Sequence, residues 1–249
     1  MKPTTQWSSP PAAPELGRGE IHVWRASLST DESTLRRLEA TLADEEKERA
    51  RRFIFKRDCD RYIAARGILR ELLGIYLRRA PESIAFVYGP RGKPAVVNPG
   101  EPPAVRFNLS HSHELAVVAV GGEREVGIDV ELMRPEFAGE EIARRYFSTK
   151  EIEELSKLPA ELRTEGFFLC WTRKEAYIMA KGDGLYIPLD SFDVSLSPDK
   201  PATLSSVDKS RWSIESFAPS LVSELSYAGA VVAEGNDWTA RYLEWRAAE

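Results

Sequence analysis

The sequence is poor in residues that make covalent or metal crosslinks. It contains two cysteines, Cys59 and Cys170, and three histidines among 249 residues. Neither cysteine belongs to a CxxC pair or lies near histidines at zinc-ligand spacing, so the sequence predicts neither a disulfide framework nor a structural zinc site. This cysteine usage is typical of a reducing compartment, and we expect the protein in the cytoplasm.

Long hydrophobic runs are missing as well. The run LAVVAV at 115–120 has the length of a strand, far below the ~20 apolar residues that cross a bilayer. Residues 1–19 hold four prolines among small and polar residues, without the apolar segment of a signal peptide. The sequence therefore predicts no membrane contact and a flexible N-terminal tail at 1–19.

The chain also lacks an excess of positive charge. Its 34 basic and 39 acidic residues give a net charge of -5, so no global field is available to bind nucleic acid or an anionic membrane. Any anion must be held by a local cluster. With 43% hydrophobic and 29% charged residues, the composition is that of a globular protein with one large domain or two small ones.

Hydrophobic periodicity predicts the same order of elements twice. In the first half we expect a strand, two helices and three strands, at 21–25, 31–52, 58–79, 84–88, 104–109 and 115–120. In the second half we expect a strand, three helices and four strands, at 126–132, 138–147, 149–158, 161–181, 192–196, 212–217, 227–233 and 239–245. The sequence thus predicts an α+β fold of two similar α/β lobes, 20–122 and 123–249, that form a pseudo-dimer within one chain. We expect a ligand in the cleft between them.

Two carboxylates share one face of the strand VGIDVEL. Asp129 and Glu131 alternate with apolar residues, so both side chains point to the same side of the sheet. Two neighbouring like charges are tolerable when solvated or when a cation bridges them, and hard oxygen ligands suit Mg²⁺ with phosphate oxygens completing its shell. A solvent-facing strand and a metal site both remain open.

Glu175 lies on a predicted apolar stripe of the helix at 161–181. Phe168, Trp171 and Ile178 recur on the same face, and a carboxylate in such surroundings needs a partner because its desolvation is costly. A salt bridge to a nearby basic residue is one interpretation. A third metal ligand or a general base is the other.

Other polar residues are candidates for anion binding. Ser110 and His111 follow a predicted strand, where a hydroxyl and an imidazole can meet a phosphate, although a surface turn has the same pattern. Six basic residues lie between Lys47 and Arg57, and Lys93 lies in the glycine-flanked turn at 89–94. These form either a local anion site or a solvated surface, and the P-loop pattern is absent.

Three motifs in order resemble the signature of the 4′-phosphopantetheinyl transferase superfamily. They are RFNLSHS at 106–112, GIDVE at 127–131 and WTRKEAYIMAKGDGL at 171–185. RRF at 51–53 and GKP at 92–94 extend the resemblance, and the two-lobed length is similar to that of the monomeric, surfactin-synthetase-activating (Sfp-like) branch. The resemblance implies transfer of the phosphopantetheine arm of coenzyme A to a serine of an apo acyl or peptidyl carrier protein. The second product would be adenosine 3′,5′-bisphosphate.

The same resemblance implies roles for individual residues. Asp129, Glu131 and Glu175 match positions that hold Mg²⁺ against the diphosphate of coenzyme A, and Glu175 would also take the proton from the serine. Phosphate-contacting or charge-stabilising roles are implied for the remaining matches, which are Arg52, Lys93, Ser110, His111, Lys174 and Lys181. His111 and Lys174 would count among the catalytic residues.

The chain departs from the family pattern at Met179, where WxxKExxxK places a lysine. Lys181 follows two residues later, about 240° around the helix from Glu175, and would need a bend at Gly182 to replace that lysine. We expect activity to survive, at a reduced rate, with Lys174, Lys181 or His111 carrying more of the phosphate charge. A coenzyme A-binding homologue without turnover, or a magnesium-dependent phosphohydrolase, remains the alternative. The residues do not indicate which carrier protein is modified or to which pathway it belongs.

Overall fold

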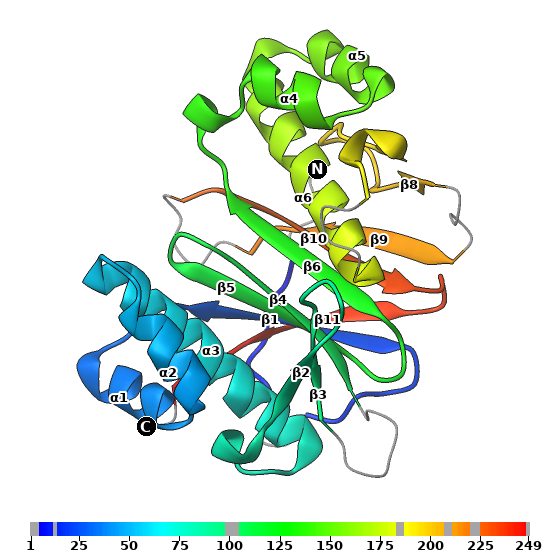
Figure 1. Cartoon of the computed structure of the whole chain (residues 1–249). Coiled ribbons are helices and arrows are strands. Elements are labelled where there is room, and N and C mark those ends of the chain that lie inside the picture. The colour runs from blue at the N-terminus through cyan, green and yellow to red at the C-terminus, as the bar shows by residue number, and fades with distance from the viewer. Residues whose placement is uncertain are drawn as a thin grey trace.

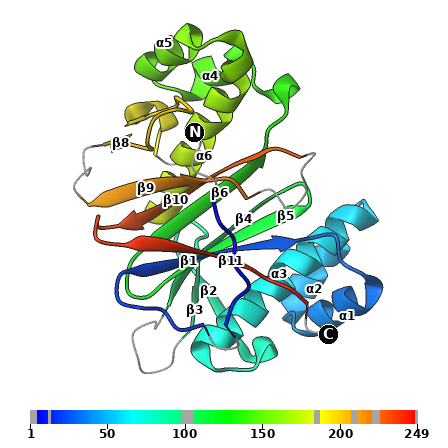
Figure 2. The same ribbon diagram turned by 180° about the vertical axis from the view of Figure 1, so that it is seen from behind.

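The computed structural model describes residues 5–11, 14–97, 105–182, 187–206, 211–219 and 225–247. Two sheets lie face to face, and helices cover the outer face of each (Figures 1 and 2). Alternate residues of the strands point inward to the other sheet and outward to the helices, which is the pattern of a layered α+β fold. The predicted fold class is confirmed.

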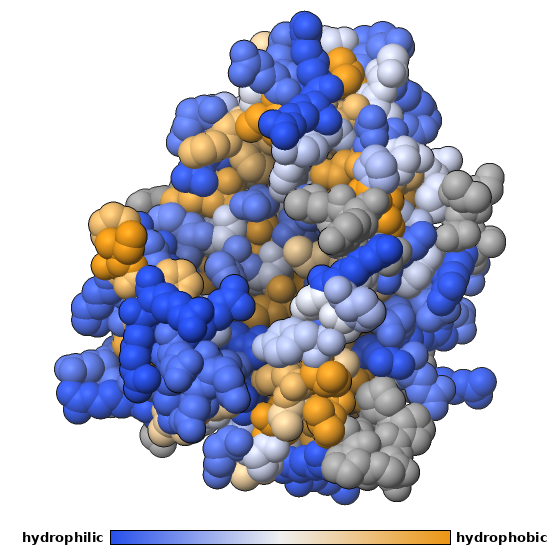
Figure 3. Space-filling model, in the orientation of Figure 1, coloured by the Kyte–Doolittle hydropathy of each residue, from blue (hydrophilic) through white to orange (hydrophobic). Residues whose placement is uncertain are grey.

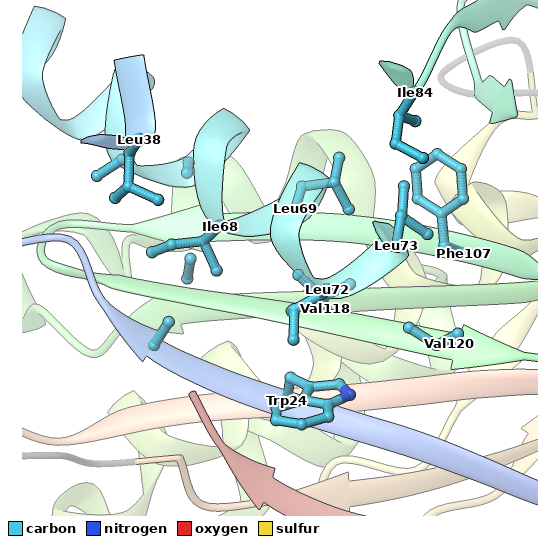
Figure 4. Close-up of a cluster of buried hydrophobic side chains, with 14 of the residues drawn as sticks. Trp24, Leu38, Ile68, Leu69, Leu72, Leu73, Ile84, Phe107, Val118 and Val120 are labelled. Carbon is cyan, nitrogen blue, oxygen red and sulfur yellow. The ribbon is translucent and has the colours of Figure 1, made fainter. Parts of the chain in front are cut away.

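The first sheet has the order β11-β1-β5-β4. Its strands are β1 (Glu20–Ser27), β4 (Arg106–Ser112), β5 (Leu115–Gly121) and β11 (Thr239–Glu244), and its helices are α1 (Glu32–Ala40), α2 (Asp44–Arg51) and α3 (Lys56–Leu77). A short 3-10 helix, η1 (Pro81–Ser83), leads to a hairpin of β2 (Phe86–Tyr88) and β3 (Pro94–Val96). Apolar side chains of α3 meet Trp24, Val118 and Val120 of the sheet to form one core (Figure 4).

The second sheet has the order β6-β10-β9. Its strands are β6 (Val126–Leu132), β9 (Trp212–Phe217) and β10 (Tyr227–Glu234), and its helices are α4 (Glu140–Tyr146), α5 (Thr149–Lys157) and α6 (Ala160–Lys181). The short elements are η2 (Pro135–Phe137), η4 (Leu189–Ser191), β7 (Asp193–Val194) and β8 (Leu204–Ser205). A third core, with Val23, Val117, Ile128 and Val231 at its centre, joins the two sheets.

The chain crosses between the halves at its two ends. β11 follows the second half in sequence but pairs in parallel with β1. Within the predicted flexible tail, Trp7 packs against Phe217 and Tyr242, and Ser8 forms a bridge with Leu243. The tail is therefore held at these residues. The boundary at 122/123 remains a prediction, because the last strand completes the sheet of the first half.

Several predicted elements differ in extent. The helix expected at 31–52 is two helices, because Thr41 donates its hydroxyl to the carbonyl of Leu38 and Leu42 turns inward against Ala50. The turn predicted at 89–94 ends in β3, which the periodicity did not indicate, and the strand predicted at 192–196 pairs only over β7. Residue 104 of the predicted strand 104–109 lies outside the described residues.

Among the described residues, no helix combines the length and the apolar character that a membrane crossing requires.

Candidate functional site

The two sheets meet where β4 runs beside β6, and polar side chains bridge them. Three buried side chains of β4 accept from the backbone of β6: Asn108 from Ile128 N–H at 2.8 Å, Ser110 from Val130 N–H at 3.3 Å and Ser112 from Leu132 N–H at 3.1 Å. Side chains thus take the place of a backbone ladder, because buried N–H groups need acceptors.

The same two serines hold the predicted carboxylates. Ser110 donates its hydroxyl to Oδ1 of Asp129, and Ser112 donates to Oε2 of Glu131, each at 2.7 Å. The hydroxyl of Ser110 therefore points to Asp129 in this arrangement. The alternation predicted for VGIDVEL is confirmed by its contacts: the four apolar residues pack into the core between the sheets, and the two acids bond to serines of β4. The polar face therefore meets β4 instead of open solvent.

Gly127 brings Glu175 to these acids. A Cβ atom built on Gly127 would lie 2.1 Å from the carbonyl oxygen of Ala176 and 2.2 Å from the nitrogen of Ala180. Only glycine permits this approach, so α6 lies directly on β6. Glu175 is half-buried at the contact, and its charge acts on Asp129 and is itself influenced by Glu131.

Burial and mutual repulsion shape the ionisation of the three carboxylates. Desolvation, and then the charge of Glu131, raise the pKa of Asp129 well above its ordinary value. Desolvation raises the pKa of Glu131, against the lowering effects of Ser112 and Arg134. Burial followed by the charge of Glu131 raises the pKa of Glu175 to about 7. The cluster therefore has a deficit of positive charge, which a cation would correct.

The ligand atoms that these three residues offer are carboxylate oxygens, which is the type that a hard divalent cation binds. Oδ2 of the buried Asp129 has no hydrogen-bond partner, and carboxylate oxygens are the ligands Mg²⁺ accepts. Over the described ranges, however, no group of three or more His, Cys, Asp or Glu side chains stands in metal-binding geometry. Asp129 and Glu131 lie two residues apart on their strand, so their Cα atoms are separated by about 7 Å. One oxygen of each is also directed to a serine instead of to a common point.

His111 lies at the edge of this region. It is on β4 with an exposed side chain, and the next turn carries Glu114, which pairs with Arg61 of α3 at 3.2 Å. Desolvation by the surrounding protein is the main effect that lowers the pKa of His111, and the charge of Arg61 lowers it further. Arg61 follows the basic segment that the sequence offers as an anion site, but nothing in the helical pattern distinguishes it from its basic neighbours.

Lys174 is placed elsewhere, and its predicted phosphate contact is wrong for this arrangement. The side chain is fully buried, and its ammonium group bonds to Glu151 at 2.8 Å and to the carbonyls of Leu189 and Phe192 at 2.6 Å each. Since an ammonium group has three protons, these partners use all of its donors. Lys174 therefore joins α5, α6 and η4 and does not face the carboxylates.

The first half contains the same arrangement, which supports the structural role. Arg70 is the fifteenth residue of α3 and Lys174 the fifteenth of α6, and both helices have 22 residues. Arg70 pairs with Glu46 at 2.6 Å and reaches the carbonyls of Pro81 and Ile84. Glu46 and Glu151 each accept from the backbone N–H three residues earlier, at the start of their helices.

The other predicted cations lie in different settings. Lys93 donates to Glu125 at 2.8 Å and to the carbonyls of Val126 and Ala180 at 3.1 and 2.9 Å, and burial lowers its pKa. Lys181 lies over the ring of Tyr177 at 5.7 Å. Arg52 is exposed after α2, in a hollow lined by Glu45, Glu48, Arg49 and Phe53. The three predicted acids thus influence one another electrostatically, whereas the predicted cations lie in separate settings.

Met179 is half-buried on α6, and Gly182 ends this helix in the left-handed region at φ 72°, as predicted. Asn108 and Ser112 were missed as functional residues. The alternation of polar side chains in RFNLSHS was the available signal for both, since residues 108, 110 and 112 share one face of the strand.

Comparisons with known proteins agree with the motifs. A family model described as the 4′-phosphopantetheinyl transferase superfamily matches residues 125–232, and one described as the N-terminal part of 4′-phosphopantetheinyl transferases matches 24–123. The 4′-phosphopantetheinyl transferase HetI of Nostoc sp. is 39% identical over 96% of this chain and 98% of its own length. Sfp of Bacillus subtilis, named with the same activity, is 32% identical over 69% of this chain and 73% of its own.

Among solved structures, a holo-(acyl-carrier-protein) synthase from Bacillus anthracis covers 45% of this chain and 96% of its own length, with a TM-score of 0.37 and 21% identity. The match to HetI covers nearly the whole sequence, and the two family matches together include all three carboxylates. This chain belongs to the 4′-phosphopantetheinyl transferase superfamily.

Proposed function

We propose that this transferase moves the 4′-phosphopantetheine arm of coenzyme A to a serine hydroxyl of an apo acyl or peptidyl carrier protein. The serine oxygen forms a bond to the β-phosphorus as the bond to the bridging oxygen of the diphosphate breaks, and adenosine 3′,5′-bisphosphate leaves. The observation that carries the proposal is that Glu175, Asp129 and Glu131 act on one another electrostatically, and that the pKa of each is raised although Arg134 acts on Glu131.

Asp129, Glu131 and Glu175 would hold Mg²⁺. The buried, unpartnered Oδ2 of Asp129 and the raised pKa of all three carboxyls support this assignment. When bound, the ion would offset the negative charge of the diphosphate. Ser110 and Ser112 would orient the two strand acids, each through a hydrogen bond to one carboxylate oxygen.

Glu175 would accept the proton of the carrier serine. An alcohol is a weak nucleophile until a base removes its proton, and a base acts best when its pKa lies near the working pH. A pKa of about 7 meets that condition. His111 and Arg61, at the edge of the site, would bind phosphate oxygens, and Arg52, Lys93 and Lys181 would do so further along coenzyme A.

The test is mass spectrometry of an apo carrier protein incubated with coenzyme A, Mg²⁺ and the enzyme. We expect the carrier to gain the mass of phosphopantetheine, with much less gain for Glu175→Gln and an unchanged gain for the exposed Glu123→Gln. A wild-type protein that binds coenzyme A without modifying any of several carriers would overturn the proposal.

Met179 is the observation that favours a second candidate, a coenzyme A-binding homologue with weak or lost transfer. Neither Lys174 nor Lys93 compensates for the missing lysine in this arrangement, since each bonds to protein oxygens. A Met179→Lys variant that gains transfer over an inactive wild type would establish this candidate. Phosphate release from coenzyme A without a carrier would indicate a phosphohydrolase. A monomer remains our expectation, because one chain contributes all three acids, and a cytoplasmic location remains our expectation from the cysteine content.

A further inference from the structure

The junction of α2 and α3 exposes three consecutive large apolar side chains. Phe53, Ile54 and Phe55, which we call the apolar tip, are 40%, 90% and 65% exposed. Figure 3 shows hydrophobic colour at the left edge of the face where Figure 1 draws this junction. The described part of the molecule already packs its interior in several apolar cores, so an exposed apolar cluster indicates an interaction site.

The apolar tip is held in place by its neighbours. The ring of Phe53 lies 5.4 Å from that of Tyr62, and its N–H donates to the carbonyl of Ala50 at 3.2 Å. The carbonyl of Phe55 accepts from the backbone of Asp58 and Cys59 as α3 begins. Ile54 therefore projects from a fixed backbone, and binding through it costs little ordering entropy.

Positive charge surrounds the apolar tip. Residues 47–57 carry six basic side chains and one acid, in a chain whose net charge is -5. Lys56 and Arg57 pair with Asp60 and Asp58. The other four basic residues, Lys47, Arg49, Arg51 and Arg52, outnumber the one acid of this segment, Glu48. A complementary partner has carboxylates around a shallow apolar depression.

α3 leads from the apolar tip to a contact with the β4–β5 turn. Arg61, one helical turn after Arg57, pairs with Glu114 in the β4–β5 turn, next to His111. The second half contributes a matching projection, because Phe137 of η2 is 46% exposed and carries Arg134 over its ring at 4.0 Å. The charge of Arg134 in turn reaches Glu131. Figure 3 shows the face hollowed between the helices of the two halves.

We propose that the apolar tip and Phe137 form the docking surface for the acceptor protein, a folded domain that presents its serine among carboxylates and a small apolar depression. This assignment rests on the proposed function. An anionic membrane would meet the same basic and apolar groups, but the net charge of -5 opposes approach to such a surface. The two projections also come from elements of different halves, the α2–α3 junction and η2, so a protein partner that contacts both would bridge the halves.

The test measures docking apart from chemistry. An apo acyl carrier protein whose acceptor serine is replaced by alanine is titrated by calorimetry into wild type, Ile54→Asp, Phe137→Ser and Val87→Asp. Val87 is 53% exposed on β2, away from the proposed surface, and serves as the matched control. Coenzyme A affinity and melting temperature are measured for each variant to show that the fold and the substrate site are intact.

We expect Ile54→Asp to weaken acceptor binding by at least 10-fold and Phe137→Ser by about 3-fold, with Val87→Asp within 2-fold of wild type. With the native carrier, Ile54→Asp should raise KM and leave kcat nearly unchanged. The docking proposal is overturned if Ile54→Asp binds the acceptor within 2-fold of the wild-type affinity. It is also overturned in favour of a membrane if, with acceptor binding unaffected, wild type sediments with phosphatidylglycerol vesicles and Ile54→Asp does not. Wild type that binds the alanine acceptor but never loads the native one refutes the proposed function and leaves the docking surface supported.

Discussion

The two halves of the molecule have the same scaffold and differ in one charge pairing. Glu71 and Glu175 are the sixteenth residues of α3 and α6, next to the buried cations Arg70 and Lys174. Glu71 pairs with Arg37 and accepts from the indole of Trp245 at 3.2 Å. Glu175 has no hydrogen-bond or ion-pair partner among the described residues and faces two further acids.

This difference distinguishes a structural glutamate, Glu71, from the candidate catalytic glutamate, Glu175. A carboxylate with a cation beside it is a structural group, whereas one placed among other acids is unstable until a cation or a proton arrives. In each half, a buried pair of a glutamate and a cation joins the long helix to the short helix before it, α3 to α2 and α6 to α5. Among the described residues, the glutamate that follows has a cation partner in the first half and none in the second. The two halves thus share a scaffold and differ in the charge compensation of this one glutamate.

The largest effect is expected where α6 touches β6. Gly127→Ala would force a methyl group into the backbone of Ala176 and Ala180, so we expect a loss of about 3 kcal/mol or more in unfolding free energy and loss of transfer. Urea denaturation checks this. Gly122→Ala, where a Cβ meets nothing within 4 Å, is the control and should be nearly neutral. Equal stability of the two variants would show that the close approach is unnecessary.

The comparison of the two glutamates is tested directly by removing each charge. Glu175→Gln should reduce kcat by about 10²–10⁴-fold, because the base is lost, with little loss of stability. Glu71→Gln should lower stability by about 1–3 kcal/mol by leaving Arg37 without its ion pair, while kcat changes little. Steady-state kinetics and denaturation of both variants distinguish these results. A similar kcat loss in both would contradict the division of roles.

Lys174 tests whether the second cation is structural. Lys174→Met should destabilise the protein by about 3–5 kcal/mol, because Glu151 is left as a buried charge. Adding Glu151→Gln should recover part of that loss, and Arg70→Met should show a comparable cost in the first half. Denaturation of the three variants is the measurement. If Lys174→Met were as stable as wild type but inactive, Lys174 would be catalytic after all.

The raised pKa of Glu175 predicts an inverse dependence of stability on pH. Its carboxyl ionises near 4.5 in an unfolded chain and near 7 in the folded protein, so between these values the folded state holds the extra proton. Stability contributed by this group is full below pH 4.5 and is lost as pH rises through about 7. Without divalent ions, wild type should lose on the order of 2 kcal/mol between pH 5 and pH 8 relative to Glu175→Gln. Parallel curves for the two proteins would rule out the raised pKa.

The smallest effect is expected at the serine beneath Glu131. Ser112→Ala removes a hydrogen bond to Glu131 and leaves the N–H of Leu132 without an acceptor, which should cost about 1–2 kcal/mol. It should also raise the Mg²⁺ concentration needed for half-maximal transfer by several-fold. Ser156→Ala, at an exposed helix position, should change neither quantity. Unchanged Mg²⁺ dependence in Ser112→Ala would remove the positioning role of this hydroxyl.

Periodicity predicted the acids because their placement is a property of single elements. Alternation put Asp129 and Glu131 on one strand face, and helical spacing put Glu175 beside apolar residues. The partners of these residues depend on contacts between elements that no local pattern contains. Lys174 meets Glu151 and two carbonyls of a later segment, and Ser112 reaches β6 from another sheet. The pairing of β11 with β1 likewise depends on the chain returning across the molecule.

We propose that Asp129, Glu131 and Glu175 together hold one divalent cation. Titration of Mn²⁺, as a spectroscopic substitute for Mg²⁺, followed by electron paramagnetic resonance in the presence of coenzyme A, tests it most directly. We predict one Mn²⁺ bound by wild type and by Glu123→Gln, and at least 10-fold weaker binding by Asp129→Asn and by Glu175→Gln. Equal Mn²⁺ affinity in wild type and both site variants would contradict the claim.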